Sequence, residues 1–254
     1  MEELNQPKAF CKALAMESQK IILSYFRSEI KIETKFDKSP VTIADKKAEE
    51  IMRSMILKEF PEHGIIGEEY GEQNSDAEYK WILDPIDGTK SFICGTPLFG
   101  TLIALVKNDN PLLGVINLPA LNQFLIGDNL SAELNNNIVS VRKCEKIEDA
   151  VLLSSDQLTA EKYRTRDGFE KLIRQVKLYR MWGDCYGYYL LASGYADIMI
   201  DPIMNKWDLA ALIPIIKGVG GTITDYYGND PMKGNSIVAT GGLIHNETLK
   251  ILNQ

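Results

Sequence analysis

Apolar residues recur at helical spacing near the start of the chain and again after a charged interval. Apolar positions from Phe10 to Tyr25 share one helical face and predict an amphipathic helix over about residues 7–27. A second such face, from Ala44 to Ile56, predicts a helix over 42–60, which Pro61 ends. The charged stretch 28–40 has no regular pattern, so we expect a loop or a short hairpin there.

Short apolar runs separated by turns follow these helices. They predict strands of an antiparallel or mixed sheet at 64–67, 81–83, 99–106, 112–117 and 124–126. Beyond about residue 145, strand patterns (151–154, 178–180, 196–200, 222–224, 237–239) alternate with helical ones (160–176, 186–193, 209–217, 246–252). Pro214 predicts a kink in the third of these helices. We expect an α/β fold, one domain over 1–254 with two subdomains that meet near residue 146.

Composition narrows the class of protein. The chain has 254 residues, 45% of them hydrophobic, and a formal charge of −7, which excludes disorder and disfavours a duplex nucleic-acid binder. It contains no apolar run of about 18 residues, and its first residues lack a secretory signal pattern, so we expect no membrane partner. Four scattered cysteines are typical of free thiols in a reducing compartment, which predicts a cytoplasmic location.

Histidine is scarce, and this limits the available chemistry. The chain has two histidines, His63 and His245, too few for a histidine-rich zinc site and a poor basis for a nucleophilic triad. Any hydrolytic chemistry is therefore expected to depend on carboxylates.

Carboxylates stand where predicted strands end or predicted helices begin. They are Glu68 and Glu69 after the strand 64–67, Asp84 and Asp87 after 81–83, Asp208 ahead of the helix 209–217, and Asp45 in the first turn of the helix 42–60. Sites in α/β sheets lie beyond strand ends, so these groups are candidates to converge. Two carboxylates about 4 Å apart repel by about 4 kcal/mol, so a cluster needs cations, and oxygen ligands favour Mg²⁺. Paired ions can activate water and stabilise a leaving oxygen, which indicates a metal-dependent phosphatase without a protein nucleophile.

Each carboxylate also has an ordinary structural explanation. Glu68 and Glu69 fit a solvated loop, Thr42-x-x-Asp45 fits a capping box, and Asp208 fits a helix cap. Asp84-Pro85 is a common start of a turn. The occurrence of all of them in one chain, in this order, favours the metal site.

That order resembles the inositol monophosphatase superfamily of Mg²⁺-dependent, Li⁺-sensitive phosphatases. The resemblance rests on Gly67-Glu68-Glu69, on the run Asp84-Pro85-Ile86-Asp87-Gly88-Thr89, on Trp207-Asp208-Leu209-Ala210-Ala211 and on Gly220-Gly221. It implies a layered αβαβα sandwich of the α/β (α+β) class, a homodimer, two or three Mg²⁺ ions, and inhibition by Li⁺.

The resemblance also implies residue roles. Glu68, Asp84 and the Ile86 carbonyl correspond to ligands of a first metal, and Asp84, Asp87 and Asp208 to ligands of a second. Asp45 and Glu69 correspond to groups around a third ion and the attacking water, which Thr89 would hold. Lys35 falls where the family carries a loop lysine near the metals. Gly88 and Thr89 open a predicted short helix, whose backbone N–H groups would bind phosphate.

Three departures from the inositol-specific pattern resemble the histidinol-phosphatase branch. The segment 40–45 is short, Gly183-Asp184-Cys185-Tyr186-Gly187 replaces small residues, and Asp201 replaces a glutamate. Asp184 and Asp201 would recognise the ammonium and imidazole of histidinol phosphate by charge-assisted hydrogen bonds. Asp184 as a helix cap and Asp201-Pro202 as a turn remain alternatives. The predicted reaction is hydrolysis of histidinol phosphate to histidinol, with inositol 1-phosphate or a related sugar or nucleotide phosphate as the alternative.

Other classes fit less well. A haloacid-dehalogenase-type nucleophile needs D-x-D-G-T, but here the two aspartates are three positions apart. Neither a dinucleotide fingerprint nor a P-loop occurs, and Cys94 and Cys185 lack an evident activating base. A non-enzymatic binding or regulatory protein of the same fold stays open, although such a protein would have no physical reason to keep mutually repelling carboxylates.

Overall fold

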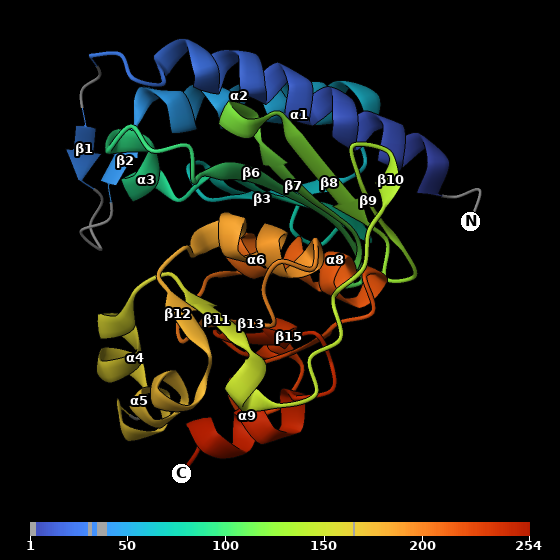
Figure 1. Cartoon of the computed structure of the whole chain (residues 1–254). Helices are drawn as coiled ribbons and strands as arrows, with labels where there is room; N and C mark the ends of the chain where they lie inside the picture. The colour runs from blue at the N-terminus through green and yellow to red at the C-terminus, as the bar shows by residue number, and fades with distance from the viewer. Residues whose placement is uncertain (1–3, 30–31, 35–39, 165) are drawn as a thin grey trace.

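Two long helices cover one face of a large sheet (Figure 1). The computed structural model describes residues 4–254 except 30–31, 35–39 and 165. Helices α1 (Asn5–Tyr25) and α2 (Ile43–Glu59) pack against each other, joined through the antiparallel pair β1 (Ile32–Thr34) and β2 (Pro40–Thr42). Thr42 and Asp45 form the predicted capping box at the start of α2, in which Thr42 Oγ1 accepts the N–H of Ala44 at 3.1 Å. We expect a loop or a short hairpin in 28–40, and the strand pair β1–β2 falls partly within this stretch.

The large sheet is mixed, as the sequence predicts. Its strands lie in the order β10-β9-β8-β7-β6-β5-β3-β4, with β3 and β5 parallel and the other neighbours antiparallel. Their bounds are β3 (Gly64–Gly67), β4 (Gly71–Gln73), β5 (Tyr79–Asp87), β6 (Gly100–Lys107), β7 (Asn110–Leu118), β8 (Gln123–Gly127), β9 (Ala132–Leu134) and β10 (Asn137–Ile138).

A middle helical layer separates this sheet from a second one (Figure 1). It contains α6 (Asp184–Ala192) and α8 (Leu212–Gly218), which contact both sheets. The second sheet has the order β12-β11-β13-β15-β14, and α5 and α9 pack on its far side. The remaining bounds are α3 (Thr89–Ile93), β11 (Val151–Ser154), α4 (Gln157–Tyr163), α5 (Arg166–Gln175), β12 (Leu178–Arg180), β13 (Ile198–Asp201), α7 (Lys206–Leu209), β14 (Thr222–Thr224), β15 (Ile237–Thr240) and α9 (His245–Leu252). The αβαβα layering expected from the resemblance is confirmed.

Two predicted helices differ from the observed ones. The single helix expected over 160–176 is two helices, α4 and α5, because Arg164 has extended backbone angles (φ −139°, ψ −169°) that end α4. The helix expected over 209–217 with a kink at Pro214 is interrupted ahead of the proline and divided into α7 and α8, while Ala210 and Ala211 between them keep helical backbone angles. Pro214 has no N–H to donate to the Ala210 carbonyl, so helical hydrogen bonding restarts at Leu212 and the proline lies in the first turn of α8.

Close packing fixes the α7–α8 segment on the large sheet. A Cβ on Gly114 of β7 would lie 1.8 Å from the Ala211 carbonyl oxygen, so a glycine is required where the segment crosses the strand. This contact sets the height of α7, which carries Asp208, above the sheet.

The four cysteines are free thiols, and three of them are buried. Among the helices of the described ranges, none combines the length and apolar character needed to cross a bilayer.

Candidate active site

A bulge in β5 turns two aspartates to the same side of the sheet. Asp84 pairs with Leu102 of β6 and Asp87 with Gly100, so β5 has one residue more than its partner across this interval. Residues three apart in a regular strand point to opposite faces, and the extra residue reverses that relation. Pro85 lies inside the bulge, where its missing N–H costs no ladder bond, and its carbonyl accepts the Thr101 hydroxyl at 2.8 Å.

Glu68 reaches the same place through the parallel pairing of β3 with β5. The Glu68 N–H donates to the Leu83 carbonyl at 3.2 Å, which continues the ladder one residue beyond β3 and sets Glu68 beside Asp84. The charge of Glu68 helps to raise the pKa of Asp84, so the two carboxyl groups are near enough to interact.

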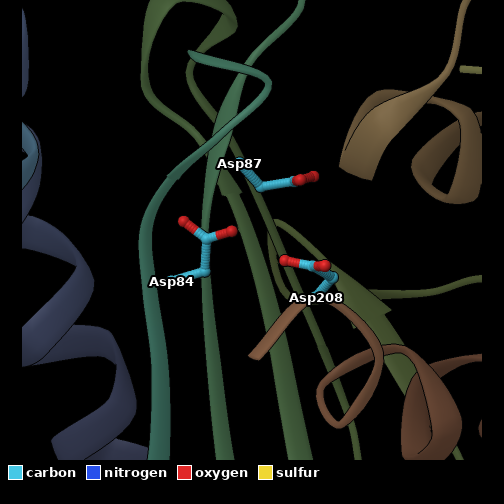
Figure 2. A group of neighbouring side chains, drawn as sticks. All are labelled: Asp84, Asp87 and Asp208. Atoms are coloured by element: carbon cyan, nitrogen blue, oxygen red, sulfur yellow. The ribbon is translucent and has the colours of Figure 1, made fainter. Parts of the chain in front are cut away.

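Asp208 completes the group from the opposite side. It is the third residue of α7, where its Oδ2 accepts the N–H of Asn205 at 2.7 Å in a capping box. Figure 2 shows the side chains of Asp84, Asp87 and Asp208 pointing toward one another. One carboxylate oxygen from each lies within 4.8 Å of the others.

Burial, together with the surplus negative charge of this cluster, changes its acid–base behaviour. Burial, followed by the charges of Glu68, Asp87 and Asp208, raises the pKa of Asp84 well above its ordinary value. Burial and the neighbouring Asp184 and Asp208 do the same for the pKa of Asp87. Burial is also the largest cause that raises the pKa of Asp208 to about 7.

The donor set fits a hard divalent cation. Asp84 is 2% exposed, and its Oδ1 has no hydrogen-bond partner among the described residues, although buried polar atoms are nearly always paired. A cation bound between the carboxylates would satisfy this oxygen and offset the repulsion, and oxygen ligands select Mg²⁺ or a similar ion.

Directly after the bulge, Gly88 and Thr89 line the cavity above the cluster. Gly88 has a left-handed backbone (φ 83°), and a Cβ there would lie 3.0 Å from the Leu98 carbonyl oxygen. The Thr89 hydroxyl donates to the Ile86 carbonyl at 3.0 Å. The cavity measures about 540 Å³ and is lined by Glu68, Asp84, Ile86, Asp87, Gly88, Thr89, Lys90, Thr159, Tyr163, Asp184, Ile203, Asn205, Trp207 and Asp208. Eight of the site residues predicted from the sequence therefore share one cavity.

Comparison with known proteins agrees with this arrangement. The sequence profile of the inositol monophosphatase family matches residues 4–254. The chain belongs to the inositol monophosphatase family. It is 45% identical over 230 residues to the bifunctional phosphatase IMPL2, chloroplastic, of Arabidopsis thaliana, covering 89% of this chain and 66% of that protein. It is 39% identical to a histidinol-phosphatase of Chlorobaculum parvum, covering 91% and 88% of the two chains. The structure of an inositol monophosphatase from Zymomonas mobilis superposes with a TM-score of 0.89 at 34% identity over 99% of both chains.

Besides Asp201, three predicted residues lie away from this cavity or outside the described ranges. Asp45 is buried, and its Oδ2 accepts both the N–H and the hydroxyl of Thr42, at 2.9 and 2.6 Å. Burial raises the pKa of Asp45, and the charge of Glu68 adds to the shift, so the two groups are near enough to interact. The Glu69 N–H donates to Glu49 at 2.7 Å. Neither Asp45 nor Glu69 lines the cavity, and their roles stay predictions; Lys35 lies outside the described residues.

The two aspartates predicted to bind substrate differ in their surroundings. Asp184 begins α6 with φ 49°, and burial and Asp201 raise its pKa to about 6 while Lys90 opposes the shift. The N-cap of α6 is Gly183, so the alternative of Asp184 as the cap is wrong. Asp201 accepts the Ser155 N–H at 3.3 Å and the Tyr188 hydroxyl at 2.9 Å, so its carboxylate ties β13 to neighbouring elements. It lines an adjoining hollow of about 140 Å³, which Asp184 also lines.

Sequence reasoning missed several residues of the cavity wall. Lys90 lines both hollows and follows the acidic run directly, so its position in the motif was an available signal. Thr159 and Tyr163 come from α4, far away in the sequence. They carry no acidic or glycine-rich pattern, and nothing in the sequence alone places α4 against β5.

Proposed function

We propose that this chain is a Mg²⁺-dependent phosphomonoesterase that hydrolyses a small phosphate ester. The observation that carries the proposal is the cluster of Asp84, Asp87 and Asp208, whose oxygens lie within 4.8 Å of one another. One of these buried oxygens, Asp84 Oδ1, has no hydrogen-bond donor among the described residues. Membership of the inositol monophosphatase family supports it.

The residues divide into those that would hold metal and those that would orient the ester. Two Mg²⁺ ions would be held by Glu68, Asp84, the Ile86 carbonyl, Asp87 and Asp208, and a third by groups near Asp45 and Glu69. Mg²⁺ supplies activation of water and stabilisation of the leaving oxygen. The backbone N–H groups of Gly88 and Thr89 bind and orient the phosphate, and the left-handed Gly88 leaves room for its close approach.

Thr89 orients the attacking water through its lone pairs. Its hydroxyl proton is directed at the Ile86 carbonyl, 3.0 Å away, so the oxygen faces the water as an acceptor. A water that donates one proton to Thr89 keeps a lone pair for attack on phosphorus.

The test of the proposal is phosphate release with and without Mg²⁺. The wild-type protein should release phosphate from at least one small ester only when Mg²⁺ is present. Asp87→Asn should fold normally by circular dichroism and lose activity by several orders of magnitude, because it removes a charge from the cluster. Wild-type activity in Asp87→Asn would exclude the mechanism, and no release from any ester would favour a binding or regulatory protein of this fold.

For the substrate we propose histidinol phosphate, with inositol 1-phosphate or a related sugar or nucleotide phosphate as the alternative. Carboxylates of Asp156, Asp184 and Asp201 line the hollow beside the metal cluster, which suits a cationic ammonium or imidazole group. The name of the Chlorobaculum parvum relative supports this choice, and that of the Zymomonas mobilis structure supports the alternative.

A panel of esters separates these substrates. Histidinol phosphate, inositol 1-phosphate, fructose 1,6-bisphosphate and 3′-phosphoadenosine 5′-phosphate would be compared by kcat/KM. Asp184→Asn should lower kcat/KM for histidinol phosphate by roughly tenfold or more, because a lost charge-assisted hydrogen bond costs about 1.5–3 kcal/mol. The kcat/KM for a phosphate ester without a cationic group should change by less than twofold. Equal losses on both esters would refute recognition by charge.

The remaining expectations from the family resemblance are part of the same proposal. Li⁺ should inhibit phosphate release, and sedimentation should show a homodimer. A cytoplasmic location can be checked by fractionation of cells that express the chain.

A further inference from the structure

Glu49 has no part in the site described so far, yet its buried carboxylate accepts three hydrogen bonds. It lies in the middle of α2 and is 0% exposed. Its two oxygens accept the backbone N–H of Glu69 at 2.7 Å, the backbone N–H of Tyr70 at 3.1 Å and the side chain of Arg53 at 2.7 Å. The donors include two consecutive residues of the turn between β3 and β4.

The chain is shaped to admit this carboxylate. A Cβ on Gly67 would lie 1.9 Å from Glu49 Oε1, so only glycine lets the side chain reach the turn. Arg53 contacts the same turn. Its Nη2 donates to the Gly71 carbonyl, and its guanidinium lies 6.0 Å from the centre of the Tyr70 ring. Residues 67–71 are thus held by two side chains of α2.

Glu68 stands between two anchored parts of the backbone. Its own N–H is bonded to Leu83 of β5, and the next two N–H groups are bonded to Glu49. With the backbone fixed on both sides, the Glu68 side chain lines the same cavity as Asp84, and its charge helps to raise the pKa of Asp84.

We propose that Glu49 is a positioning residue that holds Glu68 in place for a divalent cation. This inference rests on the proposed function, in which Glu68 is a metal ligand. Residues that orient ligands without touching the metal alter affinity by about 10- to 100-fold when they are changed.

The test is calorimetric titration of the purified full chain with Mg²⁺ alone. Glu49→Gln keeps the side-chain shape, but its amide offers one acceptor oxygen and turns an NH₂ toward groups that are themselves donors. We expect Glu49→Gln to bind Mg²⁺ at least tenfold more weakly than the wild type. Glu50→Gln is the matched control, because it removes the same charge from the next, exposed position of α2 and should stay within twofold.

A second variant covers the case in which Glu49→Gln does not fold. Glu49→Asp keeps the charge and the pairing with Arg53 but withdraws the carboxylate from the turn by one methylene, so it should fold and still bind Mg²⁺ several-fold more weakly. Folded Glu49→Gln or Glu49→Asp protein that binds Mg²⁺ within twofold of the wild type would overturn the inference.

The readout separates this inference from the proposed function. If the wild type binds Mg²⁺ and hydrolyses no ester, the phosphatase proposal fails while the titrations still decide the role of Glu49. If the wild type binds Mg²⁺ and hydrolyses an ester but the Glu49 variants bind normally, only the positioning role fails.

Discussion

Replacement of Asp208 by asparagine should make the metal-free protein more stable and remove much of its response to Mg²⁺. Asparagine has nearly the same shape, and its side-chain oxygen can still accept the Asn205 N–H that Asp208 accepts at 2.7 Å. The capping box is kept, so the substitution mainly removes one negative charge from the cluster with Asp84 and Asp87.

Charge repulsion and burial each give a similar magnitude for the stability gained by Asp208→Asn. Unit charges 4.8 Å apart repel by about 3.5 kcal/mol at an effective dielectric constant near 20. The pKa of Asp208 rises from 3.8 to about 7, chiefly by burial, which corresponds to about 4 kcal/mol of lost stability above that pH. Because Asp208 is only partly buried by surface area, we expect a gain of about 2–4 kcal/mol in the variant.

The pH dependence follows from the direction of the shift. Between pH 3.8 and about 7 the folded protein keeps a proton at Asp208 that the unfolded chain has lost, so the penalty grows as the pH rises and is complete above about pH 7. The advantage of Asp208→Asn should therefore be largest near pH 7.5 and less than half as large near pH 5.

Urea unfolding in EDTA at both pH values measures this difference. Asp230→Asn is the control, because Asp230 is exposed and caps a short helical turn by accepting the Met232 N–H at 3.1 Å. It should change stability at neither pH. Millimolar Mg²⁺ should then stabilise the wild type, by about 2.7 kcal/mol at a hundred times its Kd, and the variant much less. An Asp208→Asn protein no more stable than the wild type in EDTA near pH 7.5 would refute the idea of a buried, self-repelling cluster.

Two further predictions concern packing and acid stability. Gly114→Ala should lower the unfolding free energy by about 1–3 kcal/mol, since its Cβ would lie 1.8 Å from the Ala211 backbone oxygen; a loss below about 0.5 kcal/mol in urea would contradict that packing. His245 is buried between two threonine hydroxyls, and burial lowers its pKa to about 4, so up to about 3 kcal/mol of stability should be lost as the pH falls from 6.5 towards 4. An imidazole titration near pH 6.5 in the NMR spectrum of the folded protein would show this reasoning to be wrong.

The sequence predicts that a strand lies at the position of β5, but it does not predict the full length of that strand. The apolar run 81–83 predicts a three-residue strand, whereas β5 extends over Tyr79–Asp87. Its last part contains Asp84, Pro85 and Asp87, which hydrophobic patterning counts as a turn. Within the sheet those residues pair with β6 around a bulge, a feature that depends on the partner strand and has no local signature.

Glu49 is a different case, because the spacing of residues in the sequence does place it on the buried face of a predicted helix. Positions 45, 49, 52 and 56 fall on one face of α2, and all four are buried. A buried acidic residue on a helical face needs a partner, and this is the pattern by which Glu49 could have been found. The sequence of the helix does not show which groups Glu49 bonds, because the turn that supplies two of its donors begins almost twenty residues later.

Capping and metal binding look like competing explanations for Asp208 in the sequence, but the structure makes the two compatible in one carboxylate. Its Oδ2 closes the capping box with Asn205 while the group lies in the acidic cluster. The cap bond fixes the side chain and thereby aims it at Asp84 and Asp87. Asp208→Ala would remove the cap and the charge together, so its loss of activity could not be assigned. Comparing Ala with Asn at position 208 isolates the cap, about 1 kcal/mol of stability. Comparing Asn with the wild type isolates the charge that we propose binds Mg²⁺.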